Sequence, residues 1–432
     1  MSGLRRRPRL PRVEFGTAHP AAASPVATFY LIVIPALILC GFGLLMAFSA
    51  SAVTNIAAGA SPYEAFLRPL LIIVVSLACA AVVQLVPERI WSRGAPWVFL
   101  AALIIQCLVV TPLGATEGGN RNWIHIPGVP TLLQPSEFLK LALALFLAAS
   151  LARPGARLRD WRQMAATAGL PVLAALGAVM LGHDLGTALV VFACALGALW
   201  VAGLPGGWFA VLGGASVPAL AFFIVQNPTR LQRVIDVLPG HGASRSTTAP
   251  EQIDHALWAL GSGGLLGLGP GASREKWEYL QAAHTDFVLA IIGEEFGLLG
   301  TLTVLVCLGL LVWGMIRVCR ESTSGFARVT SGGVAAWIGA QALLNIMSVT
   351  GIGPVIGVPL PLVSYGGSSF LFTACAVGIV ASFARADAGM RMIGSPAEGP
   401  AGRDPRRPPR RRSPGRPGAH RAAPATPKEA RP

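Results

Sequence analysis

The stretch LIVIPALILCGFGLLMA, residues 31–47, carries no charged side chain. A helix rises about 1.5 Å per residue, so this block comes close to the roughly 30 Å of a bilayer's hydrocarbon core. A second block of the same kind, LLIIVVSLACAAVV, follows at residues 70–83. The chain of 432 residues is 53% hydrophobic and 12% charged, whereas soluble domains have about a quarter charged residues. These features exclude a soluble core and predict an integral membrane protein.

Length and hydropathy place about ten transmembrane helices along the chain. The expected spans are residues 28–49, 66–86, 95–113, 135–152, 163–181, 185–204, 207–226, 287–316, 327–349 and 366–385. The predicted fold class is an all-α polytopic membrane protein with a large extracellular loop between helices 7 and 8. The arginine-rich start resembles a signal peptide, but the first apolar block exceeds the 7 to about 15 residues of a signal peptide's hydrophobic region. We therefore expect a retained first span.

Lysine and arginine are distributed unevenly around these spans. With the N-terminus inside, the cytoplasmic segments hold 26 of the 34 Lys and Arg residues. Positive residues gather on the cytoplasmic side, so both termini are expected in the cytoplasm, with the protein in the cell membrane. The expected organisation is a basic N-tail (1–27), a transmembrane domain (28–385) and a disordered Arg- and Pro-rich tail (386–432). Anionic lipid or an acidic partner suits that tail better than nucleic acid.

Two outer segments, 114–134 and 227–286, are too long for simple turns. The second contains ALWALGSGGLLGLGPG (256–271), whose apolar and glycine content predicts a short interfacial or re-entrant element. It is not a nucleotide loop, because neither GxGxxG nor GxxxxGK[ST] can be read from it. The seven cysteines lie in or beside apolar blocks without CxxC spacing, so no disulfide or zinc framework is expected.

Ionisable side chains at membrane depth are costly and are therefore candidates for function. Those in or at the mouth of a predicted span are Arg121, Glu137, Lys140, Asp184, His284, Asp286, Glu294 and Glu295. All of them face the outer half of the membrane if the predicted topology is right. This convergence indicates one polar site on the outer side.

Four of these candidates also have a structural interpretation. Glu137 and Lys140, three residues apart on one helix face, could form a pair that only neutralises itself. Asp184 and Asp286 could each be the N-cap of the helix that follows. The position of Asp286 beside His284 favours instead a partly desolvated carboxylate that acts as a general base.

Three further polar features belong to the same part of the sequence. Glu295 lies nine residues beyond Asp286, roughly 14 Å deeper along a helix. Gln341 and Asn345 form an i, i+4 pair that suits hydrogen bonding between helices. The run PLPLVSYGGSS (359–369) opens the last span, where its N–H groups could receive an anion such as a phosphate or form an ordinary glycine-rich helix entry.

At these residues the chain resembles the SEDS family, the shape, elongation, division and sporulation proteins. The resemblance covers roughly residues 110–385 and runs in family order through GGNRNWIHIPGVPTLLQPSEFLKL, HDLGTAL, ALWALGSGGLLGLGPG, AHTDFVLAIIGEEFGLLG, QALLNI and PLPLVSYGGSS. REKWEYLQAAHTDF is most similar to the division branch, FtsW, because the elongation branch, RodA, usually has Arg at the position of Ala283. One departure is Gln281 and Ala282, where FtsW-like chains commonly have Pro-Glu.

The resemblance implies a peptidoglycan glycosyltransferase that polymerises lipid II on the outer face of the cytoplasmic membrane, for septal wall synthesis in cell division. Its ligands would be lipid II and the undecaprenyl-pyrophosphate-linked glycan. Its partners would be a class B penicillin-binding protein transpeptidase and other division proteins. The catalytic residues would be Asp286, Glu137 and Lys140. The substrate-binding residues would be Arg121, Trp123, Asp184, His284, Thr285, Glu295, Ser364, Gly366 and Ser368.

Under this hypothesis, Asp286 removes a proton from the acceptor hydroxyl, which attacks the anomeric carbon with inversion. Arg121 and Lys140, with a divalent cation such as Mg²⁺ or Mn²⁺ left open, would offset charge on the pyrophosphate. The alternatives are a lipid II flippase or other transporter, a RodA-type elongation polymerase, and a scaffold that only recruits the cross-linking enzyme. A transporter should be open to both faces and built from repeated halves, and no internal repeat is visible in the sequence.

Overall fold

The computed structural model describes residues 24–57, 61–117, 120–125, 132–153, 160–235, 252–276 and 285–390. Within these ranges the chain is helical apart from loops and one small sheet. The long helices are α1 (Pro25–Ala57), α2 (Pro62–Val83), α3 (Glu88–Cys107), α4 (Pro135–Leu151), α6 (Leu170–Met180), α7 (Leu185–Val201), α8 (Gly206–Val225), α11 (Val288–Glu321), α12 (Gly325–Val349) and α13 (Gly367–Asp387). The short helix α5 (Trp161–Met164) and a π-helical turn (Ala165–Gly169) extend α6 at its start.

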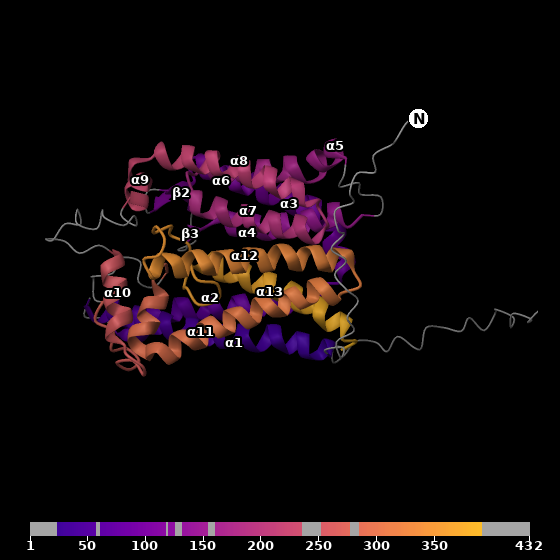
Figure 1. Cartoon of the computed structure of the whole chain (residues 1–432). Helices are drawn as coiled ribbons and strands as arrows, with labels where there is room; N and C mark the ends of the chain where they lie inside the picture. Colours follow the sequence, from indigo (N-terminus) through magenta and orange to yellow (C-terminus); the bar gives the residue numbers. More distant parts are fainter. Residues whose placement is uncertain are drawn as a thin grey trace, which may run out of the picture. The chain divides into compact units, whose positions relative to one another are not determined.

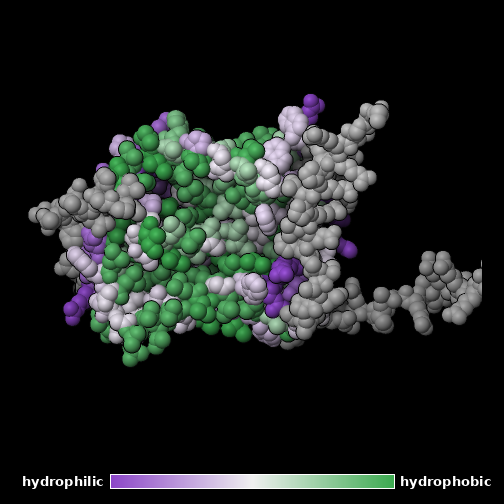
Figure 2. All heavy atoms as spheres, in the orientation of Figure 1, coloured by the Kyte–Doolittle hydropathy of each residue, from purple (hydrophilic) through white to green (hydrophobic). Residues whose placement is uncertain are grey.

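Each long helix corresponds to one of the ten predicted spans. Eight helical segments in the described ranges are long and apolar enough to cross a membrane, and α7 is a shorter apolar helix. Apolar side chains cover the middle of the helices, and hydrophilic ones gather toward both ends (Figure 2). The chain is therefore a multi-pass helical membrane protein, as predicted. Most of each predicted tail, residues 1–23 of the first and 391–432 of the second, lies outside the described residues.

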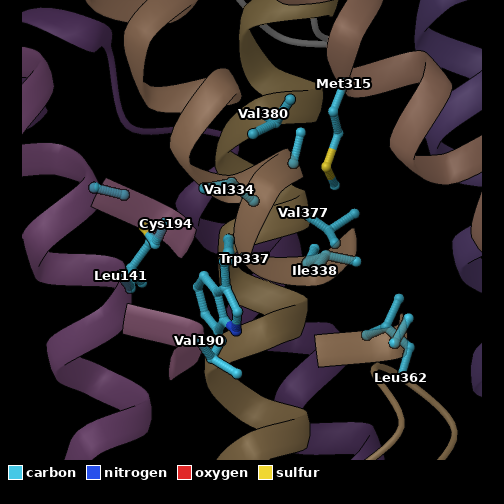
Figure 3. Close-up of a cluster of buried hydrophobic side chains, with 14 of the residues drawn as sticks. Leu141, Val190, Cys194, Met315, Val334, Trp337, Ile338, Leu362, Val377 and Val380 are labelled. Atoms are coloured by element: carbon cyan, nitrogen blue, oxygen red, sulfur yellow. The ribbon is translucent and has the colours of Figure 1, made fainter. Parts of the chain in front are cut away.

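Helix α12 lies at the centre of the bundle, between α4 and α7 on one side and α11 and α13 on the other. Small residues allow the closest approach. A Cβ on Gly197 of α7 would lie 2.3 Å from the Ala336 Cβ and 2.7 Å from the Gly332 carbonyl oxygen of α12, a contact typical of membrane helix pairs. Trp337, which is 0% exposed, fills the next layer beside Val190 (Figure 3). The polar residues of α12 are thus held in a rigid, closely packed frame.

One end of the bundle carries the remaining short elements, and we call it the sheet end (Figure 1). The strands form an antiparallel sheet in the order β1-β2-β3, with a bulge between Ala115 and Glu117. The elements are a 3-10 turn (Leu108–Val110), β1 (Gly114–Glu117), β2 (Asn120–His125), β3 (Leu132–Leu133), α9 (Pro228–Ile235) and α10 (Gln252–Ser262). The two outer segments predicted to be too long for simple turns therefore contain short strands and helices.

Helix α11 is broken at Gly297, which has φ 66 and ψ −161. The break frees backbone groups that then pair with the glycine-rich turn after α10. Leu268 N donates to the Glu294 carbonyl at 2.9 Å, and Leu298 N donates to the Gly264 carbonyl at 2.9 Å. The segment 256–271 is therefore packed against α11 rather than free in solvent, as its composition predicted.

Candidate active site

Asp286 lies in the turn that leads into α11 at the sheet end. It is not the helix N-cap, because Phe287 occupies that position. The Asp286 backbone carbonyl accepts a hydrogen bond from the Asn345 side chain at 2.7 Å. The side-chain Oδ2 of Asp286 lies 3.5 Å from the position that a Cβ on Gly357 would occupy. The side chain is half-buried, so it borders the loop that contains Gly357 without being sealed from solvent.

The surroundings of Asp286 shift its protonation. Burial raises the pKa of Asp286 to about 6, with a smaller upward contribution from the charge of Asp184. A hydrogen bond from Thr285 and the positive charge of Arg233 act in the opposite direction, lowering the pKa. A carboxylate with a pKa just below neutral is ionised at neutral pH and still accepts a proton readily, which suits a general base.

Asp184 is the N-cap of α7, which confirms its structural interpretation. Its Oδ1 accepts from the Thr187 backbone N–H at 2.9 Å, and its Oδ2 accepts from the Thr187 hydroxyl at 2.8 Å. Oδ2 also accepts from the Asn122 side chain at 2.6 Å. Because its charge contributes to the pKa of Asp286, the cap belongs to the same electrostatic environment as that carboxylate.

Arg121 and Trp123 lie on β2, and the strand supports the turn before Asp184. Arg121 N donates to the Gly182 carbonyl at 3.0 Å, and the Arg121 guanidinium donates to the Thr111 carbonyl at 2.7 Å. Trp123 is half-buried opposite Ala115. The Arg121 guanidinium is thus bound to the backbone between α3 and β1.

Glu137 and Lys140 lie in the bundle interior, each 1% exposed. Lys140 Nζ lies 2.8 Å from Glu137 Oε2 and donates to Gln341 Oε1 at 2.8 Å. It also lies 4.8 Å from the centre of the Trp337 ring, and Trp337 Nε1 donates to the same Gln341 oxygen at 2.8 Å. The lysine charge is therefore enclosed by a carboxylate, an amide oxygen and an aromatic face.

Gln341 and Asn345 connect this interior pair to Asp286. Gln341 Nε2 donates to the Pro359 carbonyl at 2.9 Å, and Asn345 Nδ2 donates to the Val358 carbonyl at 2.8 Å. Four residues of α12 separate the two amides, which is about 6 Å along the helix. The predicted role in bonding between helices is confirmed, because these side chains join α12 to α4 and to the loop before α13.

Glu295 is brought together with Ser49 and Lys276 rather than with Asp286. Its Oε1 accepts from Ser49 Oγ at 2.6 Å and from Lys276 Nζ at 2.8 Å. The neighbouring Glu294 accepts from Ser273 Oγ at 2.5 Å. Both carboxylates thus fasten the segment after α10 to the break in α11. The structure gives Glu295 an anchoring position, and its contact with substrate stays a prediction.

The run 359–369 reaches the site through Ser364. Ser364 Oγ donates to the Thr285 carbonyl, next to the proposed base. Ser368 Oγ accepts from Gln134 N at 3.1 Å, within buried surroundings, and Gly366 is the N-cap of α13. Ser364 therefore positions the turn, while Ser368 and Gly366 form the entry to the last helix.

Two arginines of α9, Arg230 and Arg233, belong to the site and were missed by sequence reasoning. They lie outside every predicted span, so the search for charges at membrane depth passed over them. Arg233 Nη1 donates to the Val355 carbonyl at 3.2 Å, and Arg230 Nη2 donates to the His183 carbonyl. Their spacing of three residues on a helix was the available signal.

Two predictions about the site, a role for His284 and a divalent cation, stay predictions. His284 lies outside the described residues. Across the described ranges, no group of three or more His, Cys, Asp or Glu side chains could hold a metal ion.

The comparison with known proteins identifies the family. The model of the family described as cell cycle protein, which comprises FtsW, RodA and SpoVE, matches residues 29–388. The chain belongs to this family. As a member of the FtsW, RodA and SpoVE family, it is 33% identical to a probable peptidoglycan glycosyltransferase FtsW from Burkholderia thailandensis, over 84% of this chain and 80% of that protein. It is 37% identical to a protein of the same name from Halorhodospira halophila, over 78% of this chain and 86% of that protein.

Solved structures of the family share the fold. A structure named "Structural coordination of polymerization and crosslinking by a peptidoglycan synthase complex" matches with a TM-score of 0.64 and 26% identity, covering 85% of this chain and 99% of that chain. The rod shape determining protein RodA of Thermus thermophilus matches with a TM-score of 0.60 and 28% identity, covering 82% and 96%. The family resemblance inferred from the sequence motifs is confirmed.

Proposed function

We propose that this chain is a peptidoglycan glycosyltransferase that polymerises lipid II for septal wall synthesis in cell division. Family membership and relatives named as probable peptidoglycan glycosyltransferases support this function. The observation that carries it is the half-buried Asp286 carboxylate at the sheet end, beside the Asp184 cap and the α9 arginines. The FtsW names of the relatives favour division, and the RodA structure keeps elongation as the alternative.

In the proposed reaction, Asp286 accepts the proton of the 4-hydroxyl of the acceptor sugar. The hydroxyl oxygen forms a bond to the anomeric carbon of the lipid-linked strand. The bond from that carbon to the pyrophosphate oxygen breaks with inversion, and undecaprenyl pyrophosphate leaves with the electron pair. A base whose pKa lies near 6 is mostly ionised at neutral pH, and positioned proton transfer contributes about 10²- to 10⁴-fold to a rate.

The proposal places the sheet end on the outer face of the cytoplasmic membrane. The distribution of lysine and arginine supports this orientation, with both termini in the cytoplasm. Helices α1 and α13 support it too, because α1 begins and α13 ends at the opposite end of the bundle (Figure 1). The partner proposed is a class B penicillin-binding protein, since one structural relative is named for coordinated polymerization and crosslinking.

The test is polymerisation of lipid II by the purified full-length chain in liposomes, alone and with its class B partner. We expect glycan strands from the wild type and a rate at least about a hundredfold lower for Asp286→Asn and Asp286→Ala. Asp387→Asn is the matched control, because Asp387 is an exposed carboxylate at the end of α13. Equal rates for folded Asp286→Ala and wild type would exclude the base. Lipid II movement across the bilayer without polymerisation would identify a flippase.

A further inference from the structure

Of the two cations first expected to meet the pyrophosphate, Lys140 is enclosed in the bundle interior, whereas Arg121 is bound to one backbone carbonyl and keeps further donors. Lys140 is buried between Glu137, Gln341 and Trp337. The Arg121 guanidinium donates to the Thr111 carbonyl. A transferase with a pyrophosphate leaving group needs positive charge where the leaving group's charge develops. The arginines of α9 lie near Asp286 and Asp184 and can supply this charge.

Helix α9 carries two arginines on one face at the sheet end. Asn227 Oδ1 accepts from the Thr229 N–H at 3.1 Å at the start of this helix. Arg230 and Arg233 are three residues apart, so their side chains leave the helix on the same side. Arg230 is half-buried and Arg233 is exposed. The Arg230 side chain is thus partly shielded from solvent, and the Arg233 side chain is open to it.

Both guanidinium groups are attached to the backbone segments that carry or border the two carboxylates. Arg230 donates to the carbonyl of His183, the residue before Asp184. Arg233 donates at 3.2 Å to the carbonyl of Val355, two residues before the glycine that borders Asp286 Oδ2. These bonds fix the direction of each side chain. A guanidinium has five N–H donors, so each arginine keeps donors beyond those used in these bonds.

The charges respond to one another. Burial lowers the pKa of Arg230, the charge of Asp184 raises it, and the charge of Arg233 lowers it. Arg233 in turn lowers the pKa of Asp286. Two arginines and two ionised aspartates sum to no net charge. Once Asp286 takes a proton, the cluster is left with one excess positive charge, just when the leaving group becomes more negative.

We propose that Arg230 and Arg233 bind the diphosphate of the lipid-linked donor and stabilise it as it leaves. The inference rests on the proposed function, because the diphosphate is the leaving group of that reaction. Guanidinium groups suit this ligand, since their planar donors bind phosphate oxygens in pairs and remain charged at all working pH values. The neutral resting cluster admits the donor, and proton transfer to Asp286 then strengthens its hold on the departing group.

The experiment uses the full-length chain in nanodiscs, with Arg230→Gln, Arg233→Gln, the double variant and the two Arg→Lys variants. Initial rates give the KM for lipid II, and added undecaprenyl diphosphate gives an inhibition constant for the isolated ligand. We expect each glutamine variant to raise the inhibition constant about tenfold, and the lysine variants to recover part of the loss. Arg162→Gln, on the exposed start of α5 at the opposite end, is the matched control.

Two outcomes separate this inference from the proposed function. If the wild type makes no glycan from lipid II, the proposed function fails. If the wild type does polymerise lipid II and the folded double variant keeps the wild-type inhibition constant for undecaprenyl diphosphate, the arginine pair does not bind the diphosphate. Arg233→Gln decides the matter alone if the double variant does not fold, because Arg233 is exposed and its replacement disturbs little packing.

Discussion

The side chain of Asn345 donates a hydrogen bond to the backbone carbonyl of Asp286 at 2.7 Å. The same amide donates to the Val358 carbonyl at 2.8 Å. One side chain of α12 therefore fixes the turn that carries the proposed base and the loop that passes beside it. The bond is made to the backbone, so it occupies neither carboxylate oxygen of Asp286, while α12 sets the position of the residue.

Replacing Asn345 by alanine should displace Asp286 without removing it. Two carbonyls lose their donor, and a shift of about 1 Å at a reacting group can lower a rate about a hundredfold. We expect Asn345→Ala to lower kcat for lipid II polymerisation by about 10- to 100-fold and to change KM little. Thr330→Val, at a buried position nearer the start of α12, is the control. An unchanged kcat would show that the bond does not position the base.

Substitutions in the buried pair of Glu137 and Lys140 should lower mainly the free energy of unfolding. Lys140→Met leaves the Glu137 carboxyl buried without its partner, and such losses cost about 3–5 kcal/mol. Glu137→Gln should cost less, because the amide can still bond to Lys140. The double variant Glu137→Gln/Lys140→Met should be more stable than Lys140→Met, since no charge is left unpaired. Thermal unfolding in detergent gives the order of stability of the three variants. A double variant no more stable than Lys140→Met would contradict the expected order.

The break in α11 should depend on glycine at position 297. Gly297 has φ 66, and a Cβ there would lie 2.4 Å from Gly267 N and 2.6 Å from the Leu265 carbonyl oxygen. Gly297→Ala should therefore detach the turn after α10 and destabilise the protein by more than about 1–2 kcal/mol. Gly309→Ala on the same helix meets nothing within 4 Å, so it should be neutral or slightly stabilising. Equal melting temperatures for the two variants would contradict this account.

The sequence predicted the helices well, because a long apolar segment in hydrocarbon satisfies its backbone hydrogen bonds within itself by forming a helix. Each of the ten expected spans has its helix, and even α4, which carries Glu137 and Lys140, begins at Pro135 as expected. A proline is tolerated at a helix start, where its missing N–H has no partner to lose. The prediction of Asp184 as an N-cap worked for a similar reason, since capping depends on residues only a few positions away.

The sequence did not reveal contacts made between distant segments. Strand β2 exists because Arg121 N bonds to Gly182 and because β1 and β3 pair with it, and none of these strands is long enough to be recognised alone. Glu295 was a candidate because its carboxylate lies inside a predicted span. In the structure, the break at Gly297 and the ion pair with Lys276 anchor it to the segment after α10. A single glycine in an apolar run does not predict such a break.

The raised pKa of Asp286 predicts opposite effects of pH on rate and on stability. The ionised base is lost as pH falls through about 6, so the polymerisation rate should drop about tenfold per pH unit below that value.

The folded state holds this proton more tightly than the unfolded chain, whose aspartates titrate near about pH 3.9. Stability contributed by protonated Asp286 is therefore present at low pH and lost as pH rises through about 6. Asp286→Asn should raise the melting temperature at neutral pH and have no effect near about pH 4. Asp387→Asn should follow the wild type in both measurements, and a flat wild-type rate between about pH 5 and 7 would contradict the assignment.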